Sequence, residues 1–313
     1  MSTSAGPRTS RWGWAALLCV LLVLSCVACV RPSVGAEPEA RDPSRVRIAS
    51  FDFPESLVVA ELYARALRDA GIPVEVLSGL GTREVVAPAL EQGQVDLVVD
   101  YAGSLLDYLG GSAAETHGQP EQVRAALLAR LAGHGLTALA SAPAEDVNAF
   151  AVRADFARQR QLTRLSDLRA LAGRLTFGGP PECPTRRYCL QGLQQTYGLR
   201  FAEFRPQPSR GATATALESG EIDVGLLETT SGQLGEGRLT LLIDDRNLQP
   251  RENLVPVVRK EIVRRYGHRL TAPLDAVSAV LTTSDLVRLN HIAAVNPVEP
   301  AEAVADYLRI TRR

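Results

Sequence analysis

The amino-acid sequence predicts an α/β fold of two similar lobes that share one cleft, and three observations lead to this prediction. Residues 46–99 alternate between short apolar runs and amphipathic stretches in a β-α-β-α-β order, which is typical of a mostly parallel sheet. The pattern ALE-x-G-x-[VI]-D, which ends a helix and begins a strand, occurs in residues 79–110 and again in residues 214–232. The length of 313 residues fits two lobes better than one small domain.

The first elements follow from turn signals and periodicity. Residues 46–50 are predicted to form a strand, and Pro54 suits the first turn of the helix that follows. Asp52, with Glu55 three residues later, resembles a capping box at the start of that helix. A second strand is expected over residues 74–77.

The stretch of residues 79–110 is the part around which the first lobe is organised. Thr82 is expected to cap its helix with the side-chain hydroxyl, and Gly93 to end that helix in a left-handed conformation. The apolar run of residues 95–99 is then a strand buried on both faces. Tyr101 follows at the carboxyl end of this strand, where open α/β sheets bind their ligands.

The second copy of this unit predicts a matching arrangement. Gly220 ends its helix, residues 222–227 form its strand, and Glu228 stands at the strand end. Periodicity predicts the remaining elements: helices over 121–133, 165–173, 192–197, 285–294 and 300–308, strands over 175–177, 239–243 and 255–258, and a strand or crossover over 148–153.

The chain is expected to leave the first lobe and to return to it. Residues 46–145 and 250–313 are assigned to lobe one and residues 146–249 to lobe two. Two crossings between lobes make a two-segment hinge, and a hinge indicates closure around a ligand.

The N-terminus has the pattern of an export signal. A basic flank with Arg8 and Arg11 precedes an uncharged apolar run, so residues 1–30 are interpreted as a signal peptide. The segments VLSC and CVAC at the end of the run resemble the lipobox of bacterial lipoproteins, with Cys26 favoured as the lipidated residue and Cys29 as the alternative. An uncleaved membrane anchor is the other interpretation, because the run is nearly long enough to span a bilayer. Either interpretation leaves the rest of the chain outside the cytoplasm.

The residues after the signal form a linker and contain one candidate disulfide. Residues 31–45 contain several prolines and little apolar content, so a flexible tether is expected. An oxidising compartment permits a disulfide between Cys183 and Cys189, whose short loop would gain roughly 2 kcal/mol from closure. A zinc site ranks lower because no histidine lies near the pair in sequence, and a cysteine nucleophile ranks lower still.

Composition and motifs exclude several classes of function. A formal net charge of −1 gives no field that would attract nucleic acid. The sequence contains no G-x-S-x-G, no H-E-x-x-H and no phosphate-binding glycine loop, so an enzyme of similar two-lobe fold is the weaker alternative. The four histidines are scattered without the spacing of a metal site, and neither a metal nor another cofactor is expected.

One family combines these features. The segments IASFDFPES, GLGTREVVAPALEQGQVDLVVDYAGSLL, APAEDVNAFAV, GPPECPTRRYCLQGLQQTYGL and DDRNLQPRENLVPVV occur in this order. Together they resemble the substrate-binding proteins of ABC importers for glycine betaine, choline, carnitine and related osmoprotectants. The resemblance covers about residues 46–310. It implies a type II periplasmic-binding-protein fold, a monomer with a closing cleft, and delivery of the ligand to a permease and its ATPase.

The resemblance also implies candidate binding residues. Such proteins hold a quaternary ammonium group in a cage of aromatic rings by cation–π attraction, which contributes up to about 2 kcal/mol for a desolvated contact. A basic residue, a threonine and backbone amides hold the ligand carboxylate. Thr82 and Arg186 match the threonine and the basic loop residue, Asp146 matches an acidic position at the first crossing, and Phe51 stands where many members carry Lys. Tyr101 remains as an aromatic residue near the site.

The cage positions depart from the family pattern. Gly79, Asn148, Glu228 and Glu252 stand where members often carry Tyr or Phe. Asn148 could hydrogen-bond a polar ligand, and Glu228 and Glu252 could attract a cation that donates N–H hydrogen bonds, such as a primary amine. The ligand implied by the family resemblance is a quaternary amine, and a cationic or amino-acid-like solute is the alternative. A third hypothesis, a receptor domain that signals through a partner, also stays open.

Overall fold

The computed structural model describes residues 1–2, 44–295 and 299–311, and residues 44–313 form one compact unit. Residues 3–30 of the predicted export signal, which include Cys26 and Cys29, lie outside the described residues, as do residues 31–43 of the predicted tether. None of the helices in the described part of the chain is both long and apolar enough to cross a membrane.

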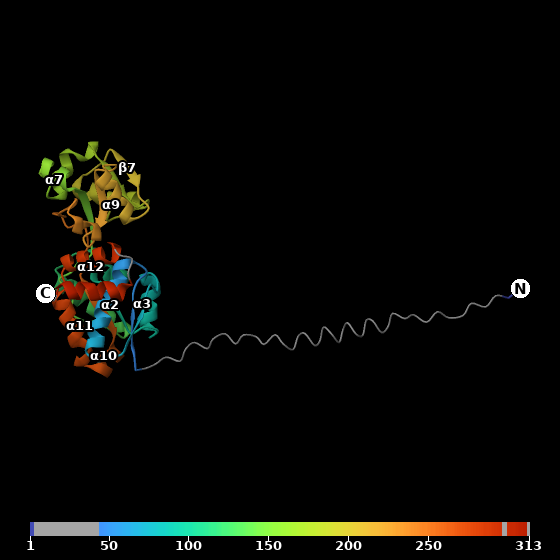
Figure 1. Ribbon diagram of the computed structural model, residues 1–313. Coiled ribbons are helices and arrows are strands. Elements are labelled where there is room, and N and C mark those ends of the chain that lie inside the picture. Colours follow the sequence, from blue (N-terminus) through green and yellow to red (C-terminus); the bar gives the residue numbers. More distant parts are fainter. Residues whose placement is uncertain (3–43, 296–298, 312–313) are drawn as a thin grey trace. The chain divides into compact units, whose positions relative to one another are not determined.

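Two five-stranded mixed sheets organise this unit (Figure 1). The first sheet has the order β2-β1-β3-β10-β4 and the second has the order β7-β6-β8-β5-β9. The strands of the first sheet are β1 (Val46–Ala49), β2 (Val74–Leu77), β3 (Leu97–Tyr101), β4 (Leu136–Ala138) and β10 (Leu254–Arg259). Those of the second are β5 (Asn148–Arg153), β6 (Thr176–Gly179), β7 (Glu203–Pro206), β8 (Val224–Glu228) and β9 (Leu239–Leu242). We call each sheet, with the helices that pack on it, a lobe.

The two sheets have the same plan. In each sheet, the two parallel strands that come first along the chain pair with each other: β1 with β2, and β6 with β7. A strand from elsewhere in the chain then pairs antiparallel in the interior: β10 lies between β3 and β4, and β5 lies between β8 and β9. The repeated pattern in the sequence therefore corresponds to a repeated piece of structure.

Equivalent residues make equivalent hydrogen bonds in the two copies of the repeat. Asp96 accepts a hydrogen bond from the backbone N–H of Arg47 at 3.0 Å, and Asp223 accepts one from the backbone N–H of Thr176 at 2.9 Å. Each aspartate thus ties the start of its strand to the neighbouring parallel strand. Gly93 and Gly220 both adopt positive φ, at 71° and 76°, where a side chain would be strained.

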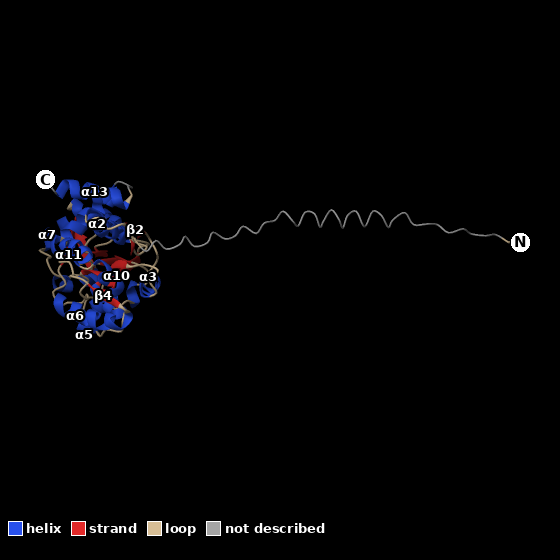
Figure 2. Cartoon of the chain, turned by 90° about the horizontal axis from the view of Figure 1, so that it is seen from below, coloured by secondary structure: helices blue, strands red, loops and turns tan. Residues whose placement is uncertain are grey.

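Helices cover the sheets and bury their apolar faces. Figure 2 shows α2 and α13 on one side of the first sheet's strands and α5 and α6 on the other. Tyr63 of α2 is fully buried, and its hydroxyl shares a hydrogen bond of 2.9 Å with Ser278 of α11, which fixes these two helices together. The helices of the first lobe are α2 (Pro54–Asp69), α3 (Arg83–Glu91), α4 (Ala102–Tyr108), α5 (Ala113–Thr116), α6 (Pro120–Leu131), α10 (Lys260–Tyr266), α11 (His268–Val280), α12 (Thr283–Val295) and α13 (Pro300–Thr311).

The second lobe has fewer and shorter helices. Its α-helices are α7 (Ala154–Arg160), α8 (Leu190–Gly192) and α9 (Arg210–Ser219), with short 3-10 turns η3 (Leu165–Ala170), η5 (Cys183–Thr185) and η7 (Gly232–Glu236). The predicted helix over 165–173 is therefore made of 3-10 turns, and the one over 192–197 continues from α8 as a π-turn. The elements β4, β7, α5, α7, α10 and α11 were not predicted. The strands among them are short, and α11 contains Pro273, which is a signal against a helix.

The predicted caps differ from the structure. The N-cap of α2 is Phe53 and no side chain caps it, so the expected capping box of Asp52 and Glu55 is wrong. Glu55 instead turns its carboxylate into the interior, where it meets Tyr101 and Asn290. Thr82 does occupy the N-cap position of α3, but its hydroxyl makes no capping hydrogen bond.

Candidate functional site

A cavity of about 700 Å³ lies between the carboxyl ends of β3 and β8, and its walls come from both lobes. The first lobe contributes the first turn of α2, the end of β3, α4 and part of α12. The second lobe contributes the start of α9, the end of β8 and the segment that follows it. The two crossing segments, near Asp146 and near Gln249, complete the wall. The repeat explains this placement, because equivalent strand ends of the two lobes face one space.

Three aromatic rings line the cavity in the described part of the chain. Phe53 precedes α2, Tyr101 ends β3, and Tyr188 lies in the loop after η5. The ring centroids of Phe53 and Tyr101 are 5.9 Å apart, with the planes tilted by 37°. Tyr101 is buried, and its hydroxyl donates to Glu55 at 2.7 Å. Burial raises the pKa of this phenol well above its ordinary value, so the ring stays neutral. Aromatic faces of this kind attract a cation.

Carboxyl groups stand beside the rings. Glu55 is buried and accepts from the side-chain amide of Asn290 at 2.7 Å as well as from Tyr101. Asp146 accepts from the hydroxyl of Thr230 at 2.7 Å. Burial raises the pKa of Asp146 well above its ordinary value, and Glu55 and Glu228 raise it further.

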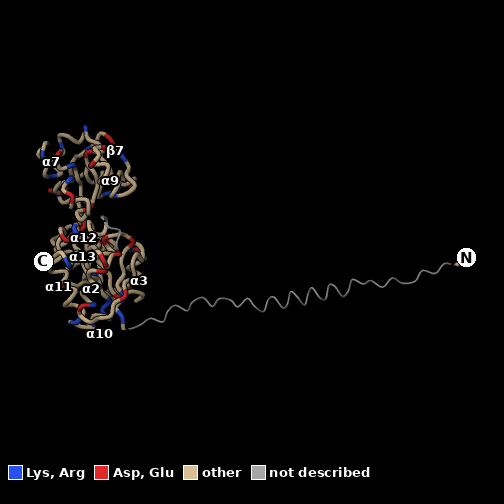
Figure 3. The backbone as a smooth tube through the Cα atoms, in the orientation of Figure 1, with Lys and Arg blue, Asp and Glu red and all other residues tan. Residues whose placement is uncertain are grey.

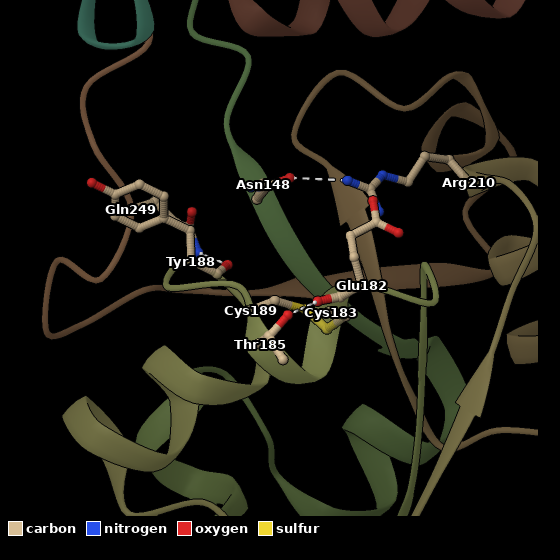
Figure 4. Close-up of a disulfide and its surroundings, with 8 residues drawn as sticks. All are labelled: Asn148, Glu182, Cys183, Thr185, Tyr188, Cys189, Arg210 and Gln249. Carbon is tan, nitrogen blue, oxygen red and sulfur yellow. Dashed lines mark hydrogen bonds between the residues drawn. A yellow bond between two sulfur atoms is a disulfide. The ribbon is translucent and has the colours of Figure 1, made fainter. Parts of the chain in front are cut away.

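An arginine of α9 binds the carboxylate at the end of β8. Arg210 is the first residue of α9, and its Nε donates to Glu228. Its Nη2 donates to the side-chain oxygen of Asn148 at 3.1 Å (Figure 4). Burial raises the pKa of Glu228, and the ion pair with Arg210 offsets part of that effect. The pair fixes one wall of the cavity in the second lobe.

The first lobe contains a matching pair. Arg83, the first residue of α3, contacts both carboxylate oxygens of Asp100, with an Nη2 to Oδ1 distance of 2.7 Å. Its guanidinium also lies 5.4 Å from the ring centroid of Phe51. Nearby, Glu252 accepts from the backbone N–H of Ser104 at 3.0 Å and from the Ser104 hydroxyl at 2.6 Å. Burial nevertheless raises the pKa of Glu252 to about 7.

A disulfide holds the loop that presents Tyr188. Cys183 and Cys189 are bonded, with their Cα atoms 5.3 Å apart, and both are buried in the core of the second lobe. Figure 4 shows this disulfide below Tyr188 and Gln249. The side-chain amide of Gln249 donates to the carbonyl of Tyr188 at 3.0 Å, which joins the loop to the second crossing segment.

The structure brings five of the eight predicted binding residues to the cavity: Tyr101, Asp146, Asn148, Glu228 and Glu252. The other three lie elsewhere. Phe51 is buried in the first lobe and stacks on Phe53 with ring centroids 5.9 Å apart. Thr82 and Arg186 are exposed and do not line the cavity, although Arg83, one residue after Thr82, and Tyr188, two residues after Arg186, do.

Several lining residues were missed, and the sequence carried a signal for some of them. In the repeat, Thr82-Arg83 corresponds to Ser209-Arg210, so extending the repeat by one helical turn would have singled out both arginines. Tyr188 stands next to a predicted disulfide cysteine, which was a second signal. Phe53, Glu55, Gln249 and Asn290 had no local signal, because only the tertiary fold brings them to the cavity. Across the described residues, no group of three or more His, Cys, Asp or Glu side chains could hold a metal ion.

Comparison with known proteins places this geometry in a family. Residues 44–309 match the family described as the substrate binding domain of ABC-type glycine betaine transport systems. The chain belongs to that family. It is therefore a solute-binding protein of the ABC transporter type rather than an enzyme, and the resemblance inferred from the sequence is confirmed.

Individual members are distant from this chain in sequence. The chain is 29% identical over 300 residues to a glycine-betaine-binding protein of Pseudomonas aeruginosa, covering 91% of this chain and 92% of the relative. It is 26% identical over 301 residues to a carnitine transport binding protein, OpuCC, of Listeria monocytogenes, covering 94% of this chain and 95% of the relative.

Solved structures of the family share the fold. A glycine betaine/carnitine/choline ABC transporter protein superposes with a TM-score of 0.76 at 23% identity, covering 85% of this chain and 98% of that one. Apo YehZ from Escherichia coli gives a TM-score of 0.75 at 24% identity, covering 86% and 99%. The predicted fold class, with two α/β lobes of the periplasmic-binding-protein type, is confirmed.

Proposed function

We propose that this protein captures a small amine-bearing osmoprotectant, of the glycine betaine or choline type or a related solute, in the cavity between its lobes. The observation that carries the proposal is the composition of the cavity wall, where Phe53, Tyr101 and Tyr188 supply aromatic faces beside the carboxyl groups of Glu55 and Asp146. Rings and carboxylates together favour a positively charged nitrogen. The relatives whose names mention glycine betaine or carnitine support this class of ligand.

Capture would work by closure of the two lobes. We propose that residues 46–145 and 250–313 move as one lobe and residues 146–249 as the other, about the crossing segments that carry Asp146 and Gln249. Closure would bring Tyr188 and Glu228 of the second lobe toward Phe53 and Glu55 of the first. Excluding water strengthens both the cation–π contacts and the charge attraction, because the local dielectric falls. The closed, loaded protein, as a monomer, would then dock on a permease that is driven by an ATPase.

The binding function is tested by thermal unfolding of the purified protein with choline, glycine betaine, carnitine and other small amines. A ligand that binds only the native state stabilises it by RT ln(1 + [L]/Kd), about 2.7 kcal/mol at a concentration of 100 Kd. We expect at least one small amine to raise the midpoint in a saturable way, and glucose, as a neutral control, to leave it unchanged. The absence of any saturable shift across the amines would contradict the proposed function.

We also propose that the protein is exported and tethered by a lipid on Cys26, with Cys29 as the alternative, at the periplasmic or cell-surface side of a membrane. Metabolic labelling with a fatty-acid analogue tests this directly. Cys26→Ser should abolish the label if Cys26 is modified, and Cys29→Ser should abolish it if Cys29 is. Label that persists in the double variant would contradict both cysteine assignments. A native sequence that takes up no label would contradict a lipid anchor and would leave an uncleaved membrane segment as the explanation for membrane association.

A further inference from the structure

The charge of the cavity differs from the charge of the chain. The whole sequence has a formal net charge of −1, and acidic and basic residues are interspersed in both lobes (Figure 3). Among the described residues that line the cavity, five carry carboxyl groups and two carry guanidinium groups. With all of them ionised, the wall would hold an excess of negative charge. A wall of this kind lowers the free energy of a cation and raises that of an anion.

Both arginines of the wall are already paired within the protein. Arg83 contacts both carboxylate oxygens of Asp100, and Arg210 binds Glu228 and Asn148. A ligand carboxylate that approached either guanidinium would have to compete with an existing partner. A zwitterion such as a betaine would therefore bring a negative group into a wall that offers it no uncommitted cation among the described lining residues.

Three carboxyl groups converge from three parts of the chain. Glu55 comes from the first turn of α2, Asp146 from the first crossing segment and Glu228 from the end of β8. Burial raises the pKa of Asp146, and the charges of Glu55 and Glu228 raise it further. Neither Glu55 nor Asp146 forms an ion pair with a described residue. Glu228 is already paired with Arg210, so Glu55 and Asp146 are the two carboxyl groups that line the cavity beside Tyr101 and Phe53 without an ion pair among the described residues.

Hydrogen-bond acceptors are also in surplus around the cavity. Gln249, which lines it, is only 8% exposed, and its side-chain oxygen has no donor within the described residues. The side-chain oxygen of Asn290, another lining residue, is also without a donor in the described part of the chain. A desolvated acceptor without a donor costs on the order of 1–3 kcal/mol, so a guest that brings N–H groups suits such a wall.

We propose that the cavity selects a ligand of net positive charge whose nitrogen carries at least one N–H, and that Glu55 and Asp146 receive that nitrogen. This inference rests on the proposed function and narrows its substrate class. A fully methylated nitrogen presents only methyl groups to the carboxylates and leaves their lone pairs without donors. A protonated amine or guanidinium forms charge-assisted hydrogen bonds with the same carboxylates and keeps its cation–π contact with the rings.

Isothermal titration calorimetry of the purified protein with three ligands of similar size tests the requirement for an N–H and the requirement for net positive charge separately. Choline and N,N-dimethylethanolamine are both cations, and they differ by a methyl group in place of the N–H. Choline and glycine betaine share the trimethylammonium group, and they differ by net charge. We expect dimethylethanolamine to bind at least about tenfold more tightly than choline, and choline at least about tenfold more tightly than glycine betaine.

Each outcome has a definite meaning. Choline binding as tightly as dimethylethanolamine would overturn the requirement for an N–H. Glycine betaine binding as tightly as choline would overturn the requirement for net positive charge, while the proposed function would stand. Binding of none of the three, together with no response to any amine in the thermal screen, would overturn the proposed function itself. Binding of carnitine alone in that screen would overturn the selection and leave the proposed function, whereas binding of another cation that carries an N–H would support both.

A matched pair of variants locates the receiving group. Asp146→Asn keeps the shape of the side chain and its contact with Thr230, but the amide cannot ionise to receive a cation. We expect it to weaken dimethylethanolamine binding by at least about tenfold. Asp107→Asn removes a charge from the same cavity wall, but Asp107 is exposed and screened by solvent, so a loss below about threefold is expected. Equal losses in the two variants would contradict the assignment of the receiving group.

Discussion

Glu252 shows how a single buried carboxyl connects the binding wall with protein stability. It is 6% exposed, and both a backbone N–H and a hydroxyl of Ser104 donate to it. Burial outweighs these two bonds and raises its pKa to about 7. The folded protein therefore binds a proton at this site over a range of pH in which the unfolded chain has released it. Ionising Glu252 above that range destabilises the fold.

The sign of the effect follows from proton binding. The native state holds more protons than the unfolded state between the ordinary carboxyl pKa and about 7, so the contribution of Glu252 to stability falls as pH rises through that window. We expect Glu252→Gln to gain stability relative to the native sequence, on the order of 3 kcal/mol, between about pH 4.5 and pH 8. Urea unfolding at several pH values measures this. Glu121→Gln, on an exposed site of α6, is the control, and a pH-independent difference for Glu252→Gln would contradict the prediction.

Prediction at the residue scale succeeded where a residue follows a recognisable strand or loop. Tyr101 and Glu228 were found because they end strands of the repeat, and both line the cavity. The family match drew attention to Thr82 and Arg186, whereas Arg83, one residue after Thr82, and Tyr188, two residues after Arg186, line the cavity instead. A side chain's direction changes with each step along the backbone, so a segment can be predicted correctly while the residue that faces the cavity is missed. Glu55 shows the limit: its sequence context indicated a helix cap, and only the fold shows that it points inward.

At the scale of elements, the repeat explains why arginine begins two helices. A positive charge at a helix N-terminus is unfavourable to the helix dipole. Arg83 and Arg210 are nevertheless the first residues of α3 and α9, and each reaches a carboxylate at the end of the following strand. These ion pairs offset the unfavourable position and tie each helix start to its strand end. The sequence predicted both helices and both strands. The ion pairs could not be predicted, because hydrophobic periodicity gives no information on the direction in which these polar side chains point.

The loop that presents Tyr188 depends on Gly192. A Cβ atom on Gly192 would lie 2.1 Å from the carbonyl oxygen of Arg187 and 2.5 Å from Leu248. Gly192→Ala should therefore displace the loop and lower the free energy of unfolding by roughly 1–3 kcal/mol. Gly173→Ala is the matched control, because nothing lies within 4 Å of its added Cβ atom and its φ is not positive. Denaturant unfolding measures the free energy of unfolding of both variants. Equal values would show that the loop shifts to accommodate the added Cβ atom without destabilising the protein.

The disulfide is expected to act on binding through Tyr188. Replacing Cys183 and Cys189 with Ala removes a constraint worth about 2 kcal/mol on the closure-entropy estimate and frees the loop. Stability should fall by a similar amount whether residue 188 is Tyr or Ala. Affinity for choline should fall only when Tyr188 is present, because the loop has then lost the ring that it positions. A double-mutant cycle with Tyr188→Ala measures this coupling. An equal loss of affinity in both backgrounds would mean that the disulfide acts on the cavity by another route.

At the scale of the whole compact unit, the lobes touch outside the crossing segments as well. Helix α12 of the first lobe packs against η7 of the second, and Asn290 of α12 donates to the carbonyl of Thr230 at 2.8 Å as well as to Glu55. A Cβ atom on Gly232 would lie 2.9 Å from the backbone nitrogen of His291, so glycine permits this close approach. The sequence predicted the two lobes and two crossings, but not this third contact, because nothing in the local pattern of α12 identifies its partner.

Because both lobes and a crossing segment supply the converging carboxyls, ligand capture should be linked to protons. Burial, Glu55 and Glu228 raise the pKa of Asp146, while Tyr101 stays neutral beside it and Arg210 remains paired with Glu228. A cation favours the ionised form, so its binding at acidic pH must displace a proton, and its affinity should rise with pH until Asp146 is ionised in the free protein.

Calorimetry of dimethylethanolamine binding in two buffers of different ionisation enthalpy counts the protons released. At acidic pH we expect release of up to about one proton for each ligand bound, with less release at higher pH once the carboxyl has ionised. Asp146→Asn should reduce the release at the lower pH, whereas Asp107→Asn should leave it in place because Asp107 is exposed. Proton uptake on binding, or release that is unchanged in Asp146→Asn, would show that the charge balance of the cavity is carried by other groups.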